Sequence, residues 1–168
     1  MELRIRNKWV SLSGSSIVKD ENEKDVLQVK GRFFSIRRRK YVTDLEGNVK
    51  YQVRNRFWNF FRHAAFVFDK DGNQVAKVQT KYFTLHDHLN VETSLGDLVI
   101  RGNILGFDYH ITLNGKDIGH VARKISLRDS FVLTLDDDNA DKYFWVALVI
   151  AIDNITDERN NNNSSYYD

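Results

Sequence analysis

A five-residue phrase that recurs at nearly even spacing constrains the fold of this chain more than any other feature. The phrase begins with a basic residue, continues with two apolar residues and a small or polar one, and ends with an apolar residue. Its copies and degraded copies start 21 to 25 residues apart, as KWVSL from Lys8, RFFSI from Arg32, RFWNF from Arg56, KYFTL from Lys81, NILGF from Asn103 and KISL from Lys124. A fixed period of this length indicates one supersecondary unit per repeat.

Turn signals lie between the copies of this phrase. The tetrapeptides DLEG and DKDG end at Gly47 and Gly72, shorter turn sequences end at Gly96 and Gly115, and DENEK from Asp20 takes the same place in the first repeat. Aspartate and glycine in this arrangement supply the side-chain hydrogen bonds and the positive φ of hairpin loops, and short alternating runs flank each turn. The sequence therefore predicts six β-hairpins and about twelve strands.

The chain contains no proline among its 168 residues, so proline cannot protect the edges of a sheet. Closing the strands into a barrel removes the edges altogether. A barrel of about eight strands is just filled by its own side chains, so a twelve-stranded barrel needs something more inside it. We therefore expect a mainly β protein with one helix, built as an antiparallel β-barrel of about twelve strands from six hairpin repeats.

A continuous apolar block that includes FWVALVIAI replaces the alternating pattern between Ala140 and Asn154. Four polar residues, 136–139, precede it, as is typical before a helix N-terminus. A helix of this length reaches about 22 Å, which is short of the roughly 30 Å of a bilayer core, and it has no polar face. We expect it to lie inside the barrel, with no transmembrane span. The sequence predicts one domain over 1–156, with the helix at about 140–154, and a disordered polar tail over 157–168.

These motifs resemble the LURP-one-related family, which groups with tubby C-terminal domains and phospholipid scramblases. The phrase RFFSI, the hairpin KISLRDSFVLTLDDD and the helix DKYFWVALVIAID carry the resemblance, which covers residues 1 to about 156. It implies a twelve-stranded barrel around a central hydrophobic helix. It also implies a non-enzymatic, tubby-like binding module, because tubby domains bind phosphoinositides and scramblase relatives act at membranes.

Positive charge is concentrated in the first part of the chain. Residues 1–63 hold 15 Lys and Arg against 7 Asp and Glu, a net charge of +8, and residues 64–168 hold 10 against 16, a net charge of −6. Basic side chains interleaved with aromatic ones suit an anionic membrane interface. The expected ligand residues for anionic phospholipid headgroups or phosphorylated partners are Arg37, Arg39, Lys40, Arg54, Arg56 and Arg62. The alternative is a structural or protein-interaction domain without a specific small ligand.

The sequence contains no recognisable catalytic constellation. It has no P-loop, no His-Glu-x-x-His motif and no nucleophile elbow, so we expect no enzyme activity and no cofactor. His86 and His88 share a strand face without a third ligand at suitable spacing, so no metal site is expected. We expect an anionic membrane surface or a protein as the partner rather than nucleic acid. Without cysteine or the apolar core of a signal peptide, the chain is expected to be cytoplasmic, with peripheral membrane contact.

Overall fold

The computed structural model describes residues 1–6, 15–31, 39–58, 62–79, 88–123 and 130–164. Four copies of the repeated phrase, those starting at Lys8, Arg32, Lys81 and Lys124, lie outside these ranges. The described residues form twelve strands: β1 (Glu2–Arg6), β2 (Ser15–Asp20), β3 (Asp25–Gly31), β4 (Arg39–Thr43), β5 (Val49–Trp58), β6 (Arg62–Asp69), β7 (Gln74–Gln79), β8 (His88–Thr93), β9 (Leu98–Asn103), β10 (Asp108–Leu113), β11 (Lys116–Arg123) and β12 (Ser130–Leu135). One helix, α1 (Lys142–Ser164), follows them.

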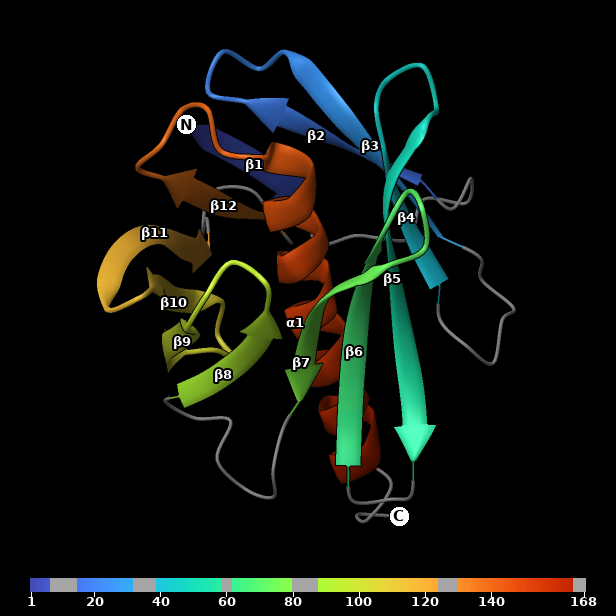
Figure 1. Cartoon of the computed structure of the whole chain (residues 1–168), viewed down its shortest axis with the longest axis vertical. Coiled ribbons are helices and arrows are strands. Elements are labelled where there is room, and N and C mark those ends of the chain that lie inside the picture. Colours follow the sequence, from blue (N-terminus) through green and yellow to red (C-terminus); the bar gives the residue numbers. More distant parts are fainter. Residues whose placement is uncertain (7–14, 32–38, 59–61, 80–87, 124–129, 165–168) are drawn as a thin grey trace.

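The strands close into a single antiparallel barrel around α1 (Figure 1). Each strand pairs with its neighbours in the sequence, and β1 closes the barrel by pairing with β12 from Glu2↔Thr134 to Arg6↔Ser130. Alternate residues point inward, so Leu3 and Ile5 of β1 and Leu133 of β12 are almost fully buried. The predicted twelve-stranded barrel with a hydrophobic helix is confirmed.

The turns show why the repeats fold as hairpins. In the β4–β5 turn the Asp44 carboxylate accepts hydrogen bonds from the backbone and side-chain nitrogens of Asn48, both at 2.8 Å, and Gly47 has a φ of 95°. The β6–β7 turn repeats this arrangement with Asp69 and Asn73. The carboxylate organises the loop backbone while the glycine takes the left-handed conformation that other residues avoid. The predicted Asp-x-x-Gly turns therefore form for the expected reason.

The helix differs from the expectation at both ends. It begins at Lys142, because Asp141 caps it by accepting hydrogen bonds from the backbone N–H groups of Tyr143 (3.0 Å) and Phe144 (3.2 Å). It continues to Ser164, so residues 157–164, expected to be disordered, are helical. Asn154 lies within the helix, where it is buried and donates a 3.0 Å hydrogen bond to Asn55. Residues 157–164 also contain no glycine or proline that would stop a helix.

The apolar part of α1 forms the centre of the core. Every residue from Val146 to Ile152 is completely buried, which agrees with a helix that has no polar face. The helix packs most extensively against β4, β5, β6 and β7, so it lies to one side of the barrel axis. Among the described residues, no helix is long and apolar enough to cross a bilayer.

Ala147→Asp tests how far the fold depends on this helix. Ala147 is fully buried, so the mutation places an unpaired charge in the core at a cost of several kcal/mol, a large part of a typical domain's stability. We expect the variant to lose its cooperative thermal transition, measured by circular dichroism. Asn139→Asp, at an exposed position before the helix, should melt like the wild type. A cooperative transition in Ala147→Asp close to that of the wild type would contradict the role of the helix.

The β4–β5 turn gives a prediction about acid stability. Hydrogen bonds from Asn48, together with nearby Lys50, lower the pKa of Asp44 to about 2 from its ordinary value of 3.8. The folded-state pKa lies below the unfolded one, so the carboxylate stabilises the fold above about pH 4, and this contribution is lost as the pH falls toward 2. Urea titrations of Asp44→Asn should show lower stability than the wild type at pH 6 and converging stability near pH 2. A constant difference between the two proteins across this range would refute the assignment.

Candidate functional site

Two of the predicted basic residues face each other across neighbouring strands. Arg39 on β4 pairs with Arg54 on β5, and both side chains are half-buried. Phe66 of β6 is the opposite partner of Arg54. On the same strand Ala65 and Val67 are fully buried, so the alternation places Phe66 and Phe68 on the outer face of the barrel. We call this region of Arg39, Arg54, Phe66 and Phe68 the basic wall.

The guanidinium of Arg54 is held in place on the basic wall. Its Nη2 donates a 2.6 Å hydrogen bond to Gln52, and its Cζ lies 4.4 Å from the centre of the Phe68 ring. A cation over an aromatic face is attracted by the ring quadrupole. Within the described residues, the Nε atoms of Arg39 and Arg54 are buried and have no hydrogen-bond partner. The pair therefore carries two positive charges, and the Arg54 charge is held in place by Gln52 and Phe68.

Lys40 lies apart from the basic wall, although it adjoins Arg39 in the sequence. Its Nζ lies 3.7 Å from Oδ2 of Asp153, which is fully buried on α1, and the Lys40 side chain is only 16% exposed. Lys40 therefore links β4 to the helix on the inside of the barrel. Burial and, to a smaller extent, the charge of Asp153 raise the pKa of the neighbouring Tyr109 phenol, which stays protonated.

The other predicted ligand residues are placed only in part. Arg56 lies on β5 opposite Ala64, and Arg62 lies on β6 opposite Trp58. Arg37 lies outside the described residues. Of the six predicted residues, the structure therefore brings Arg39 and Arg54 together and directs Lys40 elsewhere.

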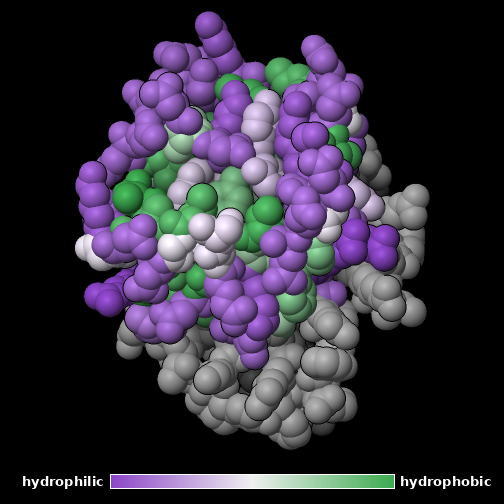
Figure 2. Space-filling model, viewed as in Figure 1, coloured by the Kyte–Doolittle hydropathy of each residue, from purple (hydrophilic) through white to green (hydrophobic). Residues whose placement is uncertain are grey.

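A second feature, a cavity of about 490 Å³, was not predicted from the sequence. It lies at the end of the barrel where α1 begins. Figure 2 shows apolar side chains gathered at the centre of this face, with hydrophilic ones around them. The cavity is lined by the start of the helix, by the turns that follow β8 and β10, and by the segment that follows β12: Tyr51, Val75, Ser94, Leu95, Leu113, Lys116, Ile118, Leu135, Asp136, Asp137, Ala140, Asp141, Phe144 and Trp145. The sequence signal that could have revealed it is Leu95, an apolar residue in a turn. In the structure Leu95 is 47% exposed.

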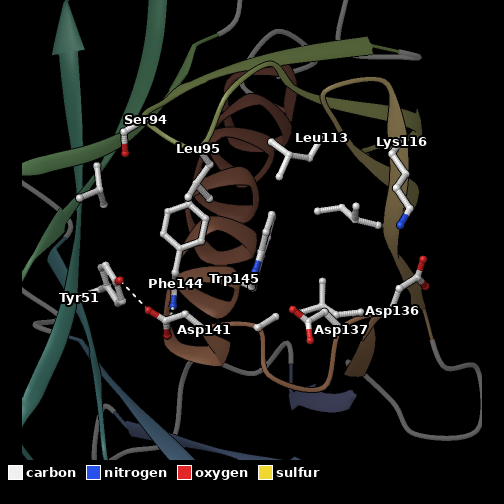
Figure 3. Close-up of a pocket in the computed structure, with 14 residues that line it drawn as sticks. Tyr51, Ser94, Leu95, Leu113, Lys116, Asp136, Asp137, Asp141, Phe144 and Trp145 are labelled. Atoms are coloured by element: carbon white, nitrogen blue, oxygen red, sulfur yellow. Dashed lines mark hydrogen bonds between the residues drawn. The ribbon is translucent and has the colours of Figure 1, made fainter.

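The start of α1 forms one wall of the cavity, where Phe144 and Trp145 pack edge to face with their ring centres 5.2 Å apart (Figure 3). Tyr51 packs against Phe144 and donates a 2.7 Å hydrogen bond to Asp141. Burial and this hydrogen bond both raise the pKa of the Tyr51 phenol, so it remains a donor. The hydrogen bond between Tyr51 and Asp141 therefore connects the helix cap to the cavity wall. We call these residues the hydrogen-bonded unit at the helix start.

Two histidines lie opposite each other on β10 and β11, the exposed His110 and the half-buried His120. His110 and His120 have ring centres 4.6 Å apart, and each is hydrogen-bonded to an aspartate, His110 to Asp117 and His120 to Asp108. In the part of the chain that the structure describes, no three His, Asp or Glu side chains are grouped to hold a metal ion.

The sequence matches the LURP-one-related family over residues 1–153, nearly the whole chain. The chain belongs to the LURP-one-related family. No curated protein matches it closely enough to be reported. Among solved structures, the chain is similar to an X-ray structure of a protein from Arabidopsis thaliana, with a TM-score of 0.61 and 18% sequence identity over 92% of this chain and 91% of the other. At this identity the likeness establishes the fold.

Membership of the LURP-one-related family, together with the closed barrel, places this chain among tubby-like binding domains, a non-enzymatic type. The expected family and the expected class of tubby-like binding domain are thus confirmed.

Asp141→Ala tests the hydrogen-bonded unit at the helix start. The variant loses the helix cap and the acceptor for Tyr51, so we expect the free energy of unfolding to fall by about 1–2 kcal/mol in urea titrations. Asp141→Asn keeps an oxygen that can accept these hydrogen bonds and should lose much less. Equal losses in the two variants would show that the carboxylate charge, rather than capping, stabilises this end.

Proposed function

We propose that this member of the LURP-one-related family is a binding module that docks on anionic phospholipid headgroups through the basic wall. The observation that carries the proposal is the cross-strand pair of Arg39 and Arg54 beside Phe66 and Phe68. Arginine guanidiniums bind phosphate oxygens through several N–H groups at once. Phenylalanine side chains next to them add apolar contact at the boundary between headgroups and acyl chains.

The energy of such docking is modest and depends on salt. A basic residue near an anionic leaflet contributes about 1 kcal/mol. Electrostatic attraction is screened over about 10 Å at 0.1 M salt, so binding should weaken steeply as salt is added. This gives reversible, peripheral contact from the cytoplasmic side, and it needs no inserted helix.

Co-sedimentation with vesicles of phosphatidylserine and phosphatidylcholine tests the proposal. We expect the wild type to bind these vesicles at low salt and to ignore vesicles of phosphatidylcholine alone. The double variant Arg39→Gln/Arg54→Gln should bind the anionic vesicles about tenfold more weakly, because two half-exposed cations are lost.

The matched control is Arg101→Gln/Arg123→Gln. It removes the same charge from exposed positions on β9 and β11, across the barrel from β4 and β5. It should bind nearly as well as the wild type. An equal loss in both double variants would indicate a response to net charge only. A wild type that ignores anionic vesicles even at low salt would favour the protein-interaction alternative.

A further inference from the structure

The cavity at the start of α1 has the dimensions and chemistry of a binding site separate from the basic wall. Its volume of about 490 Å³ lies within the range of about 300–1,000 Å³ typical of ligand pockets. Its walls are mainly apolar, and Leu95, Leu113, Phe144 and Trp145 surround the central space (Figure 3). Such a space suits a bulky apolar group.

The cavity follows from the position of the helix. α1 packs most extensively against β4 to β7, whereas the turns after β8 and β10 and the segment after β12 form the other side of the cavity. Those two turns are tied together, because Asn114 accepts a 2.9 Å hydrogen bond from the backbone N–H of Asp97 and donates its own N–H to the Asp97 carbonyl at 2.8 Å. These hydrogen bonds fix the two turns relative to each other at the rim.

The charges on the rim determine which ligand charge the cavity favours. Asp136 and Asp137 are both exposed, and in the described part of the chain neither forms an ion pair. The adjacent Asp138 is neutralised by the amino group of Met1, and Asp141 accepts the hydroxyl of Tyr51. Against these carboxylates the lining offers one cation, Lys116. The rim therefore favours a positively charged group and disfavours an anionic one.

The wall of the cavity also holds a donor that is not used. Trp145 is only 5% exposed, and no described residue accepts a hydrogen bond from its indole N–H. The Nε1 atom is not among the described buried polar atoms that lack a partner, so its N–H is accessible to solvent in the free protein. A carbonyl oxygen of a bound peptide would satisfy it, and a purely hydrocarbon ligand would not.

We propose that this cavity binds a short basic and hydrophobic segment of a protein partner. A bulky apolar side chain fills the space between Leu95 and Trp145, a backbone carbonyl accepts the Trp145 N–H, and a flanking lysine or arginine pairs with Asp136 and Asp137. A basic and apolar peptide thus supplies a partner for the apolar space, for the Trp145 N–H and for the rim carboxylates.

Titration with the blocked peptide acetyl-Arg-Leu-Phe-Arg-amide tests this proposal. The readout is the indole N–H resonance of Trp145 in the full chain, assigned by its disappearance in Trp145→Phe. We expect a saturable shift of this resonance. Acetyl-Glu-Leu-Phe-Glu-amide and acetyl-Arg-Ser-Ser-Arg-amide should each bind at least fivefold more weakly, since one has the wrong charge and the other lacks the apolar group.

Variants then locate the site. Asp136→Asn/Asp137→Asn should weaken binding about fivefold, and Asn at 137 keeps the oxygen that accepts the N–H of Asn139. The matched control Glu21→Gln/Glu46→Gln removes the same charge from exposed turns that do not line the cavity, and it should bind like the wild type. Leu95→Ser, at an exposed position that the fold tolerates, should also weaken binding.

Three results would overturn the proposal. The first is the absence of a saturable Trp145 shift with the basic peptide at millimolar concentration. The second is equal binding of the acidic peptide, which would remove the role of the rim charges. The third is stronger binding of an anionic amphiphile such as dodecyl phosphate, which would identify the cavity as a lipid site.

Discussion

A barrel of twelve strands encloses more space than its own inward side chains can fill, and the stability of this protein depends on how that space is occupied. The inward positions are mostly small or branched, such as Val53, Ala65, Val67 and Ala76, which would leave a large void alone. The apolar part of α1 fills this void. Burial of one large apolar side chain, such as Leu, Ile, Val or Phe, contributes about 1.5–3 kcal/mol to stability. Barrel and helix therefore depend on each other, since neither has another surface that could cover its apolar face.

The position of the helix determines what the two candidate surfaces can do. Its packing against β4–β7 brings Asp153 beside Lys40, so the strand that carries Arg39 is anchored from inside by an ion pair. At the start of the helix, Phe144 and Trp145 line the cavity together with Tyr51, Val75 and the turns after β8 and β10. The position of α1 in the barrel therefore affects both the basic wall and the cavity.

Local sequence patterns were sufficient for the barrel and the helix, because both follow from periodicity. Asp44 and Asp69 identify hairpin turns by side-chain chemistry that acts within five residues, and the apolar run around Ala147 identifies a buried helix. The burial of Asn154 within the helix was not predictable in this way, since its partner Asn55 lies 99 positions away. The cavity was not predictable either, because it arises from where α1 packs. For the basic residues, strand alternation limited how many could share a face, but only the register showed that Arg39 meets Arg54.

The topology also determines where the basic and acidic parts of the sequence lie in the barrel. Because each strand pairs with its neighbours in the chain, β1 to β5 form one arc of the barrel and β6 to β12 form the other. Among the described residues, Arg39 and Arg54 lie on the first arc, whereas Asp136 and Asp137 follow the last strand of the second. An anionic surface attracts the first arc and repels carboxylates such as Asp136 and Asp137 at the cavity rim.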